Sequence, residues 1–215
     1  MFPKYPKIQS VYKRDEKGKI LEGQFTKPEF EYLLYNKWIW TEKIDGTNIR
    51  VKYDGETFEI RGRTDRAQLH PDLMFALIST FNDKMLELCR KTFEDKEIIF
   101  YGEGVGPKIQ KRGKYYLKGE YGFILFDILI GNVWLKRDDV EKIAESLDLH
   151  IAPVIRKGSL IDAIAYVKDG FKSYFGDFPA EGLVLRPEVE MLDRLGNRII
   201  TKVKYVDFNK DSFFS

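Results

Sequence analysis

The residues best suited to chemistry lie together in one short stretch, Glu42 through Asn48. This stretch holds an amine, two carboxylates, an Asp-Gly pair and an amide. An apolar run, Trp38 to Trp40, precedes it, and an alternating run, Ile49 to Tyr53, follows it. A lysine at a tight corner between two strands is well placed to act as a nucleophile. The pattern alone is weak, because Asp-Gly is a common hairpin turn and a neighbouring lysine is usually only solvated.

Other charged residues interrupt predicted strands where apolar residues are expected. They are Glu103, Asp127, Glu181, Lys202 and Lys204. A charge buried in a strand costs several kcal/mol unless it is paired, so each needs a reason, although the solvent face of a strand would explain any one of them. Strand alternation puts both lysines on one face, and two adjacent cations favour an anionic ligand.

The surrounding pattern predicts the elements that position these residues. Thr26 to Glu29 resembles a capping box opening a helix through Leu34. Residues 53–57 predict a hairpin turn, and apolar spacing from Leu73 to Phe93 predicts one or two amphipathic helices. Further strands are predicted at 97–104, 123–130, 133–135, 181–187 and 198–205, with helices capped by Asp138 and Ser159. Strands joined by tight turns outnumber helices, which favours an antiparallel α+β fold.

Composition excludes several classes of protein. The chain has 215 residues, 33% of them charged, and a net charge of +2. That length allows a full core, and no apolar run approaches a membrane span. The first residues lack an apolar signal segment, and a lone cysteine, Cys89, excludes an internal disulfide or a cysteine metal cluster. A reducing, cytoplasmic location is expected, in a host cell if the source is viral.

One segment is locally basic. Five cations fall within the eleven residues from Lys108 to Lys118, interleaved with Tyr115 and Tyr116. Cations among aromatics suit nucleic acid or polyphosphate, whereas the alternative is a solvated loop.

Taken in order, these motifs resemble the covalent nucleotidyltransferases, which include polynucleotide ligases and messenger-RNA capping enzymes. Lys43 to Gly46 resembles the nucleophile motif, and Arg63 the arginine of the next motif. Phe100 to Glu103, Phe126-Asp127, Glu181 to Val184 and Lys202 to Lys204 resemble the later ones. The segments 106–111 and 1–5 resemble the type 2 RNA ligases, the branch of phage double-strand RNA-repair and trypanosome RNA-editing ligases.

The resemblance implies a fold and a reaction. The fold would be an ATP-grasp-like nucleotidyltransferase domain of mainly antiparallel twisted sheets flanked by helices, with ATP in the cleft between sheets. Lys43 would attack the α-phosphorus of ATP to form lysyl-AMP, pass AMP to a 5′-phosphate RNA end, and a 3′-hydroxyl would then seal the break. A free lysine has a pKa of about 10.4, so the site must favour the neutral amine. Burial, Lys202, Lys204 and bound Mg²⁺ (or Mn²⁺) are expected to do this.

The family's roles carry over position by position. Lys43, Glu181, Lys202 and Lys204 would be catalytic, with both later lysines on the α-phosphate. Glu42 and Phe126 would contact adenine, Glu103 and Arg63 the ribose, and Asn48 a phosphate, with Ile44 beside them. Glu181 would work with the metal, held largely by ATP phosphates and water. Gln110, Lys111, Arg112 and Arg198 are candidate RNA contacts.

Two departures from the family pattern stand out. Gly62 precedes Arg63 where phage relatives carry a lysine, which affects one ribose-side or phosphate contact. The chain also ends soon after Lys204, so we expect one adenylyltransferase domain over residues 1–215 with no OB or other C-terminal domain.

The expected substrate is RNA with 5′-phosphate and 3′-hydroxyl ends, as in a nicked duplex. A monomer is expected, without a membrane, and with a possible protein partner in place of the C-terminal domain. The alternatives are a DNA ligase, a GTP-dependent capping enzyme, a domain competent only for self-adenylylation, and a binding module that keeps the fold without the chemistry.

Overall fold

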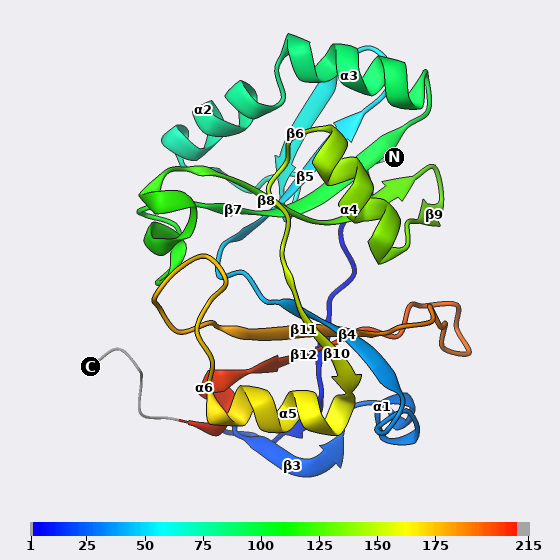
Figure 1. The fold of residues 1–215 in the computed structure, drawn as a ribbon, viewed down its shortest axis with the longest axis vertical. Helices are drawn as coiled ribbons and strands as arrows, with labels where there is room; N and C mark the ends of the chain where they lie inside the picture. The colour runs from blue at the N-terminus through cyan, green and yellow to red at the C-terminus, as the bar shows by residue number, and fades with distance from the viewer. Residues whose placement is uncertain (1, 210–215) are drawn as a thin grey trace. The chain divides into compact units, whose positions relative to one another are not determined.

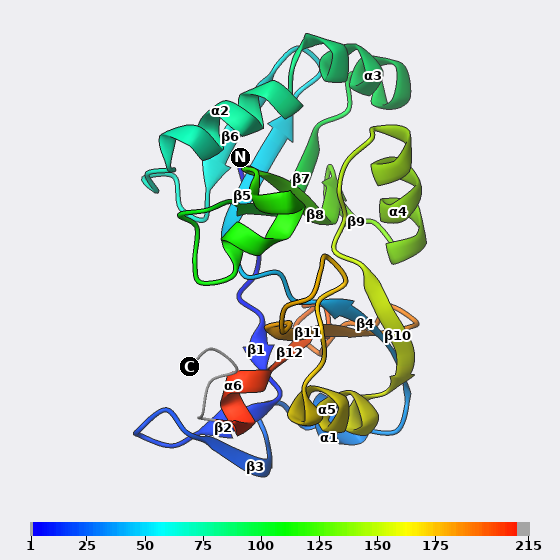
Figure 2. The same ribbon diagram turned by 60° about the vertical axis from the view of Figure 1, so that its left-hand side comes forward.

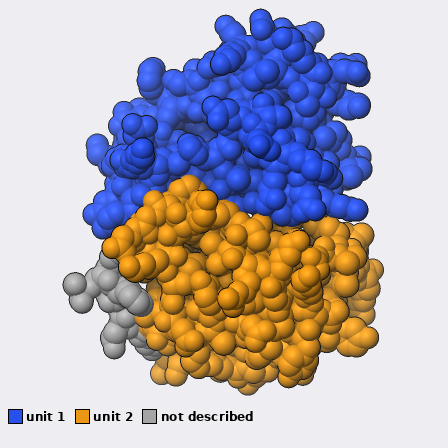
Figure 3. All heavy atoms as spheres, in the orientation of Figure 1, with its two compact units in different colours: residues 1–6, 45–152 blue, residues 7–44, 153–215 orange. Residues whose placement is uncertain are grey.

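The computed structural model describes residues 2–209, and these form two compact units. Unit 1 contains residues 1–6 and 45–152, and unit 2 contains residues 7–44 and 153–215 (Figure 3). The chain therefore passes from unit 2 into unit 1 between Ile44 and Asp45, immediately after Lys43.

Unit 1 is built on one five-stranded antiparallel sheet in the order β6-β5-β7-β8-β9 (Figure 1). Its strands are β5 (Thr47–Tyr53), β6 (Phe58–Gly62), β7 (Ile98–Val105), β8 (Gly122–Ile130) and β9 (Val133–Trp134). Its helices are α2 (Pro71–Thr80), α3 (Asp83–Phe93), the 3₁₀ segment η1 (Gly113–Gly119) and α4 (Arg137–Ser146).

The two faces of this sheet have different surroundings. Ile49, Val51 and Phe100 point to the face where α2, α3 and α4 supply Leu73, Met85, Val140 and other apolar residues, and together they form the core of the unit. Because side chains alternate along a strand, Asn48, Arg50, Tyr101 and Glu103 point to the opposite face. That second face carries the unit's polar residues.

Unit 2 is built on a five-stranded sheet in the order β1-β12-β11-β4-β10 and a separate β2-β3 hairpin. Its strands are β1 (Gln9–Ser10), β2 (Tyr12–Arg14), β3 (Ile20–Phe25), β4 (Lys37–Glu42), β10 (Val154–Ser159), β11 (Gly182–Pro187) and β12 (Thr201–Lys204). Its helices are α1 (Pro28–Tyr32), α5 (Leu160–Asp169) and α6 (Tyr205–Phe208). Only β1 and β12 pair in parallel in this sheet.

Helix α5 runs across one face of this sheet (Figure 1, Figure 2). It buries Leu160, Ala163 and Val167 against Trp38 and Trp40 of β4 and their neighbours on β11 and β12. Both tryptophans are fully buried, and a large apolar side chain contributes about 1.5–3 kcal/mol when it is removed from water. This packing holds β4, which ends at the residue before Lys43.

The antiparallel α+β prediction is confirmed, as are the 53–57 hairpin and the two helices between residues 73 and 93. Ser159 caps α5 as predicted, by accepting from the Asp162 N–H at 3.1 Å. Within residues 2–209, no helix is both long and apolar enough to cross a membrane.

Several local predictions were wrong. The Thr26 hydroxyl donates to Ser10 O instead of capping α1, whose N-cap residue is Lys27 and which ends at Tyr32. The N-cap residue of α4 is Lys136, so Asp138 lies in the first turn of that helix. The last strand begins at Thr201 rather than Arg198. The alternative that Asp45-Gly46 is an ordinary hairpin turn is excluded, because β4 and β5 belong to different sheets. For Thr26, a tertiary contact outweighed the local capping signal.

A substitution at Gly182 tests the pairing of β11 with β12 directly. A Cβ at this position would lie 2.0 Å from Val203 O, a backbone atom that cannot move without separating the strands. We expect Gly182→Ala to lower the free energy of unfolding by about 3 kcal/mol. Urea titration followed by circular dichroism measures this.

Gly18→Ala is the matched control, since Gly18 also has a positive φ, +76°, but has no atom near its added Cβ. Its expected cost is about 1 kcal/mol, from backbone strain alone. Equal losses for the two variants would contradict the steric argument.

Candidate functional site

In unit 2, one carboxylate joins two of the predicted lysines. Lys43 Nζ donates to Glu181 Oε2 at 2.6 Å, and Lys204 Nζ pairs with Glu181 Oε1 at 2.7 Å. We call Lys43, Glu181, Lys202 and Lys204 the lysine–carboxylate cluster. The structure therefore brings three of its members, distant in sequence, into direct contact.

Backbone pairing explains why these side chains meet. The Lys43 N–H donates to Gly182 O at 2.9 Å, and the Tyr205 N–H donates to Glu181 O at 3.0 Å. Glu181 is thus held between the ends of β4 and β12. Lys202 lies on the same face of β12 as Lys204, because the intervening Val203 points into the core.

The electrostatics of Glu181 follow from these two ammonium groups. Burial, with the side chain only 7% exposed, acts to raise its pKa, but the charges and hydrogen bonds of Lys43 and Lys204 outweigh burial and hold the pKa below its ordinary value. An ionised Glu181 in turn stabilises the ammonium form of Lys43. The sequence argument considered only cations and burial around Lys43, and the structure adds this opposing carboxylate.

Glu42 lies on the other face of the same sheet. It is opposite Leu183, a residue of the unit 2 core, and is 1% exposed. Its oxygens accept from the Ser173 hydroxyl at 2.5 Å and from the Tyr174 N–H at 2.8 Å. Burial raises the pKa of Glu42 despite these two hydrogen bonds. The structure does not bring Glu42 to the lysine–carboxylate cluster, and its predicted contact with adenine stays a prediction.

In unit 1, three residues predicted to bind nucleotide share the sheet face that lies away from the helices. Asn48 on β5 is directly opposite Glu103 on β7, and Phe126 follows on β8. The Oδ1 atom of Asn48 is buried and has no hydrogen-bond partner within residues 2–209. A buried polar atom without a partner costs free energy, so this amide is suited to a polar group of a ligand.

A β-bulge sets the direction of Phe126. Tyr101 pairs with Asp127 but Gly102 pairs with Leu125, so Phe126 is the extra residue of β8. Phe126 and Asp127 consequently both contact Tyr5: the rings of Tyr5 and Phe126 lie 4.9 Å apart, and the Tyr5 hydroxyl donates to Asp127 at 2.8 Å. Bulges commonly redirect side chains next to active sites.

The basic segment after β7 is anchored to Asp45. The Arg112 N–H and guanidinium both contact Asp45 Oδ2, at 3.2 and 3.4 Å, and the Tyr116 hydroxyl accepts from the Asp45 N–H. Arg112 is buried by this pairing, whereas Gln110 and Lys111 are exposed.

The remaining predicted residues are placed as follows. Arg63 is exposed just after β6, and Ile44 is 3% exposed at the end of unit 2. Arg198 pairs with Glu190 at 2.9 Å. Within the described residues, no three His, Cys, Asp or Glu side chains gather to hold a metal ion.

Sequence reasoning missed Ser173, Tyr116 and the hydroxyl of Tyr5. Each acts through a contact across more than 70 positions of chain, which the sequence alone does not indicate.

The sequence model of the RNA ligase family matches residues 36–204. The chain belongs to the RNA ligase family. The matched segment contains Lys43, Glu103, Glu181 and Lys204 and spans both compact units.

Solved RNA ligases share the fold of this family member. A variant of the Naegleria gruberi RNA ligase with ATP and Mn is 20% identical, with a TM-score of 0.68, over 98% of this chain and 59% of that one. The same ligase with PPi gives 0.65 at 20% identity over 97% and 64%, and a variant with AMP and Mn gives 0.63 at 19% over 96% and 64%. This chain thus spans about three fifths of the structures it matches.

The lysine–carboxylate cluster predicts a pH-dependent contribution to stability. Since the pKa of Glu181 is lowered by folding, its stabilisation is present above the unfolded pKa and is lost as pH falls through the folded pKa. At pH 7 we expect Glu181→Gln to lower the free energy of unfolding by about 1–3 kcal/mol. The difference from wild type should shrink in acid, as measured by urea titrations from pH 7 down to pH 3.

Glu188→Gln is the matched control, because Glu188 also bridges two lysines, Lys37 and Lys157, but on the surface. Its effect should be much smaller and should weaken with salt. A loss as large as that of Glu181→Gln would contradict the assigned role of burial.

Proposed function

We propose that this chain is an ATP-dependent RNA ligase of the type 2 branch that works through a lysyl-AMP intermediate on Lys43. The observation that carries the proposal is the shared carboxylate: in a member of the RNA ligase family, Glu181 holds Lys43 and Lys204 at 2.6 and 2.7 Å. The known relatives' complexes with ATP, AMP and Mn support the choice of nucleotide and metal.

The first step forms a bond between Lys43 Nζ and the α-phosphorus of ATP and breaks the bond to the β-phosphate, releasing pyrophosphate. Lys43 must lose a proton to react. Lys202 and Lys204 bind the α-phosphate and offset the charge that builds up during transfer.

This role of Lys204 also supplies a route for the proton. When Lys204 turns from Glu181 to phosphate, one cause of the lowered carboxylate pKa is removed. Glu181 then becomes a better acceptor for the proton of Lys43, 2.6 Å away. Resting lysine is thereby kept charged until nucleotide arrives.

In the second step a 5′-phosphate oxygen of RNA attacks the lysyl-AMP phosphorus, and Lys43 leaves as the amine. In the third step a 3′-hydroxyl attacks the activated 5′-phosphate, forms the phosphodiester bond and releases AMP.

The residues of unit 1 are assigned to the nucleotide. Phe126 stacks on adenine, Glu103 and Arg63 contact the ribose, and Asn48 contacts a phosphate through the amide that has a buried, unpartnered oxygen. A divalent cation, Mg²⁺ or Mn²⁺, would neutralise triphosphate charge and would be held largely by phosphates and water, with Glu181 as its candidate protein ligand. We assign both units to one adenylyltransferase domain.

Covalent labelling tests the nucleophile. Wild type with Mg²⁺ and α-labelled ATP should retain label through denaturation, Lys43→Ala should retain none, and label should not come from GTP. Lys37→Ala, on the strand that precedes Lys43 but with a 60% exposed side chain, should label like wild type. Label from GTP alone would indicate a capping enzyme, and no label in either protein would indicate a binding module.

Sealing assays test the acceptor. With ATP and Mg²⁺, we expect a 5′-phosphorylated nick with RNA on its 3′-hydroxyl side to be sealed at least tenfold faster than the same nick in DNA. Equal or faster sealing of DNA would support a DNA ligase. Labelling without sealing of any nick or single strand would support a self-adenylylating domain that needs a partner.

A further inference from the structure

Arg50 is the one basic side chain in residues 2–209 that is fully buried. It lies on β5, on the polar face of the unit 1 sheet, opposite Arg61 of β6. A guanidinium cannot lose its charge in a protein, so burying it requires well-placed acceptors.

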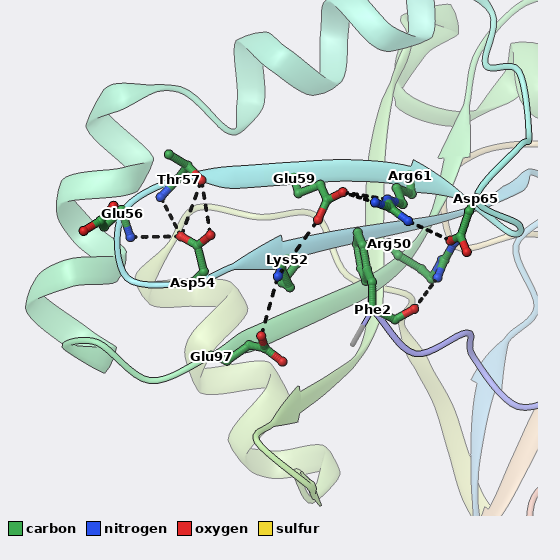
Figure 4. A network of polar contacts seen from close by, with 10 residues as sticks. All are labelled: Phe2, Arg50, Lys52, Asp54, Glu56, Thr57, Glu59, Arg61, Asp65 and Glu97. Carbon is green, nitrogen blue, oxygen red and sulfur yellow. Dashed lines mark hydrogen bonds and ion pairs between the residues drawn. The ribbon is translucent and has the colours of Figure 1, made fainter.

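Those acceptors lie on two separate segments of chain, the turn after β6 and the N-terminal Phe2. Arg50 Nε donates to Gly62 O at 2.9 Å, and its Nη2 donates to Asp65 Oδ1 at 2.8 Å. Its Nη1 donates to Phe2 O at 2.9 Å, and the Phe2 ring lies 4.7 Å from the guanidinium. Figure 4 shows the contacts of Arg50 with Asp65 and Phe2.

The two acceptors after β6 flank one residue of the proposed site. Gly62 precedes Arg63, and Asp65 follows it by two positions. Arg63 is itself exposed and follows the last residue of β6, so burial does not hold its side chain. Arg50 therefore hydrogen-bonds to the turn on both sides of Arg63, at Gly62 and at Asp65.

A second set of ion pairs supports the same turn. Asp65 Oδ1 also pairs with Arg61 Nη1 at 3.1 Å, and Arg61 pairs with Glu59 in turn. The Arg61 guanidinium lies 5.2 Å from the Phe2 ring, so Phe2 packs against both arginines. The pKa of Asp65 is lowered by its hydrogen bonds from Arg50 and Arg61, which keeps it ionised.

We propose that Arg50 and Asp65 are positioning residues that hold the 62–65 turn so that Arg63 meets the ribose of ATP. This inference rests on the proposed function. The competing explanation is that the network only fastens the hairpin and residues 2–6 and contributes nothing to nucleotide binding.

A double-mutant cycle separates the two explanations. We expect Asp65→Ala to raise the KM for ATP in lysyl-AMP formation about tenfold, with little change in kcat, because it loosens a binding residue. Arg63→Ala should raise KM at least as much. The double variant should be no worse than Arg63→Ala alone, since a loosened turn matters only when Arg63 is present.

Asp54→Ala is the matched control, because Asp54 organises the opposite end of the same hairpin (Figure 4). It accepts from the Glu56 and Thr57 N–H groups at 3.1 and 2.9 Å. This variant should disturb the hairpin yet leave the KM for ATP unchanged. A rise in KM equal to that of Asp65→Ala would overturn the inference.

Arg50→Lys adds a second test, because a lysine ammonium cannot reach three acceptors in fork geometry. Amide hydrogen exchange of residues 62–66 should accelerate in both Arg50→Lys and Asp65→Ala. If Arg50→Lys does not fold, the exposed Asp65 still carries the cycle.

The results distinguish failure of the positioning role from failure of the proposed function. Wild type that forms lysyl-AMP, with additive KM effects in the cycle, overturns the positioning role alone. Wild type that forms no covalent AMP overturns the proposed function, and the positioning role with it.

Discussion

The interaction on which the proposed chemistry depends is the sharing of the Glu181 carboxylate by two lysines. Each oxygen is committed to a different ammonium, and those ammoniums come from β12 and from the residue after β4. Without the two ammonium groups, burying the carboxylate would cost free energy. Without the carboxylate, the two ammonium groups would repel each other. The two ion pairs of Glu181 therefore connect the ends of β4, β11 and β12. The same two ammonium groups hold the pKa of Glu181 below its ordinary value despite its burial.

On the polar face of the unit 1 sheet, neighbouring polar side chains also have separate roles. Alternation along β5 places Asn48, Arg50 and Lys52 on the same side, and each meets a different need. Lys52 pairs with Glu97 at 3.6 Å, Arg50 ties the turn after β6, and Asn48 keeps a buried oxygen without a partner in the described chain. Each nitrogen of the Arg50 guanidinium therefore has an acceptor, whereas the neighbouring Asn48 amide keeps an oxygen that can still accept a hydrogen bond.

Local errors in prediction had a common cause. Thr26 and Asp138 have the right chemistry for helix caps, but the Thr26 hydroxyl bonds to Ser10, sixteen positions away. Asp-Gly at 45–46 is a good hairpin signal, yet the strands on either side belong to different sheets. Capping and turn signals describe what a segment can do alone, whereas long-range pairing decides among the options. Glu42 lies on the core face of its sheet, and its predicted contact with adenine stays a prediction.

The sequence by itself determined the antiparallel α+β class, the main helices and strands, and the ordered motifs that mark the RNA ligase family. These follow from apolar periodicity, turn residues and motif spacing, all of which are local. Only the tertiary structure decided that Glu181 lies between Lys43 and Lys204, that a bulge turns Phe126 toward Tyr5, and that Arg50 grips the turn around Arg63. Those facts depend on strand register and burial between residues far apart in the chain, and no short stretch of sequence contains them.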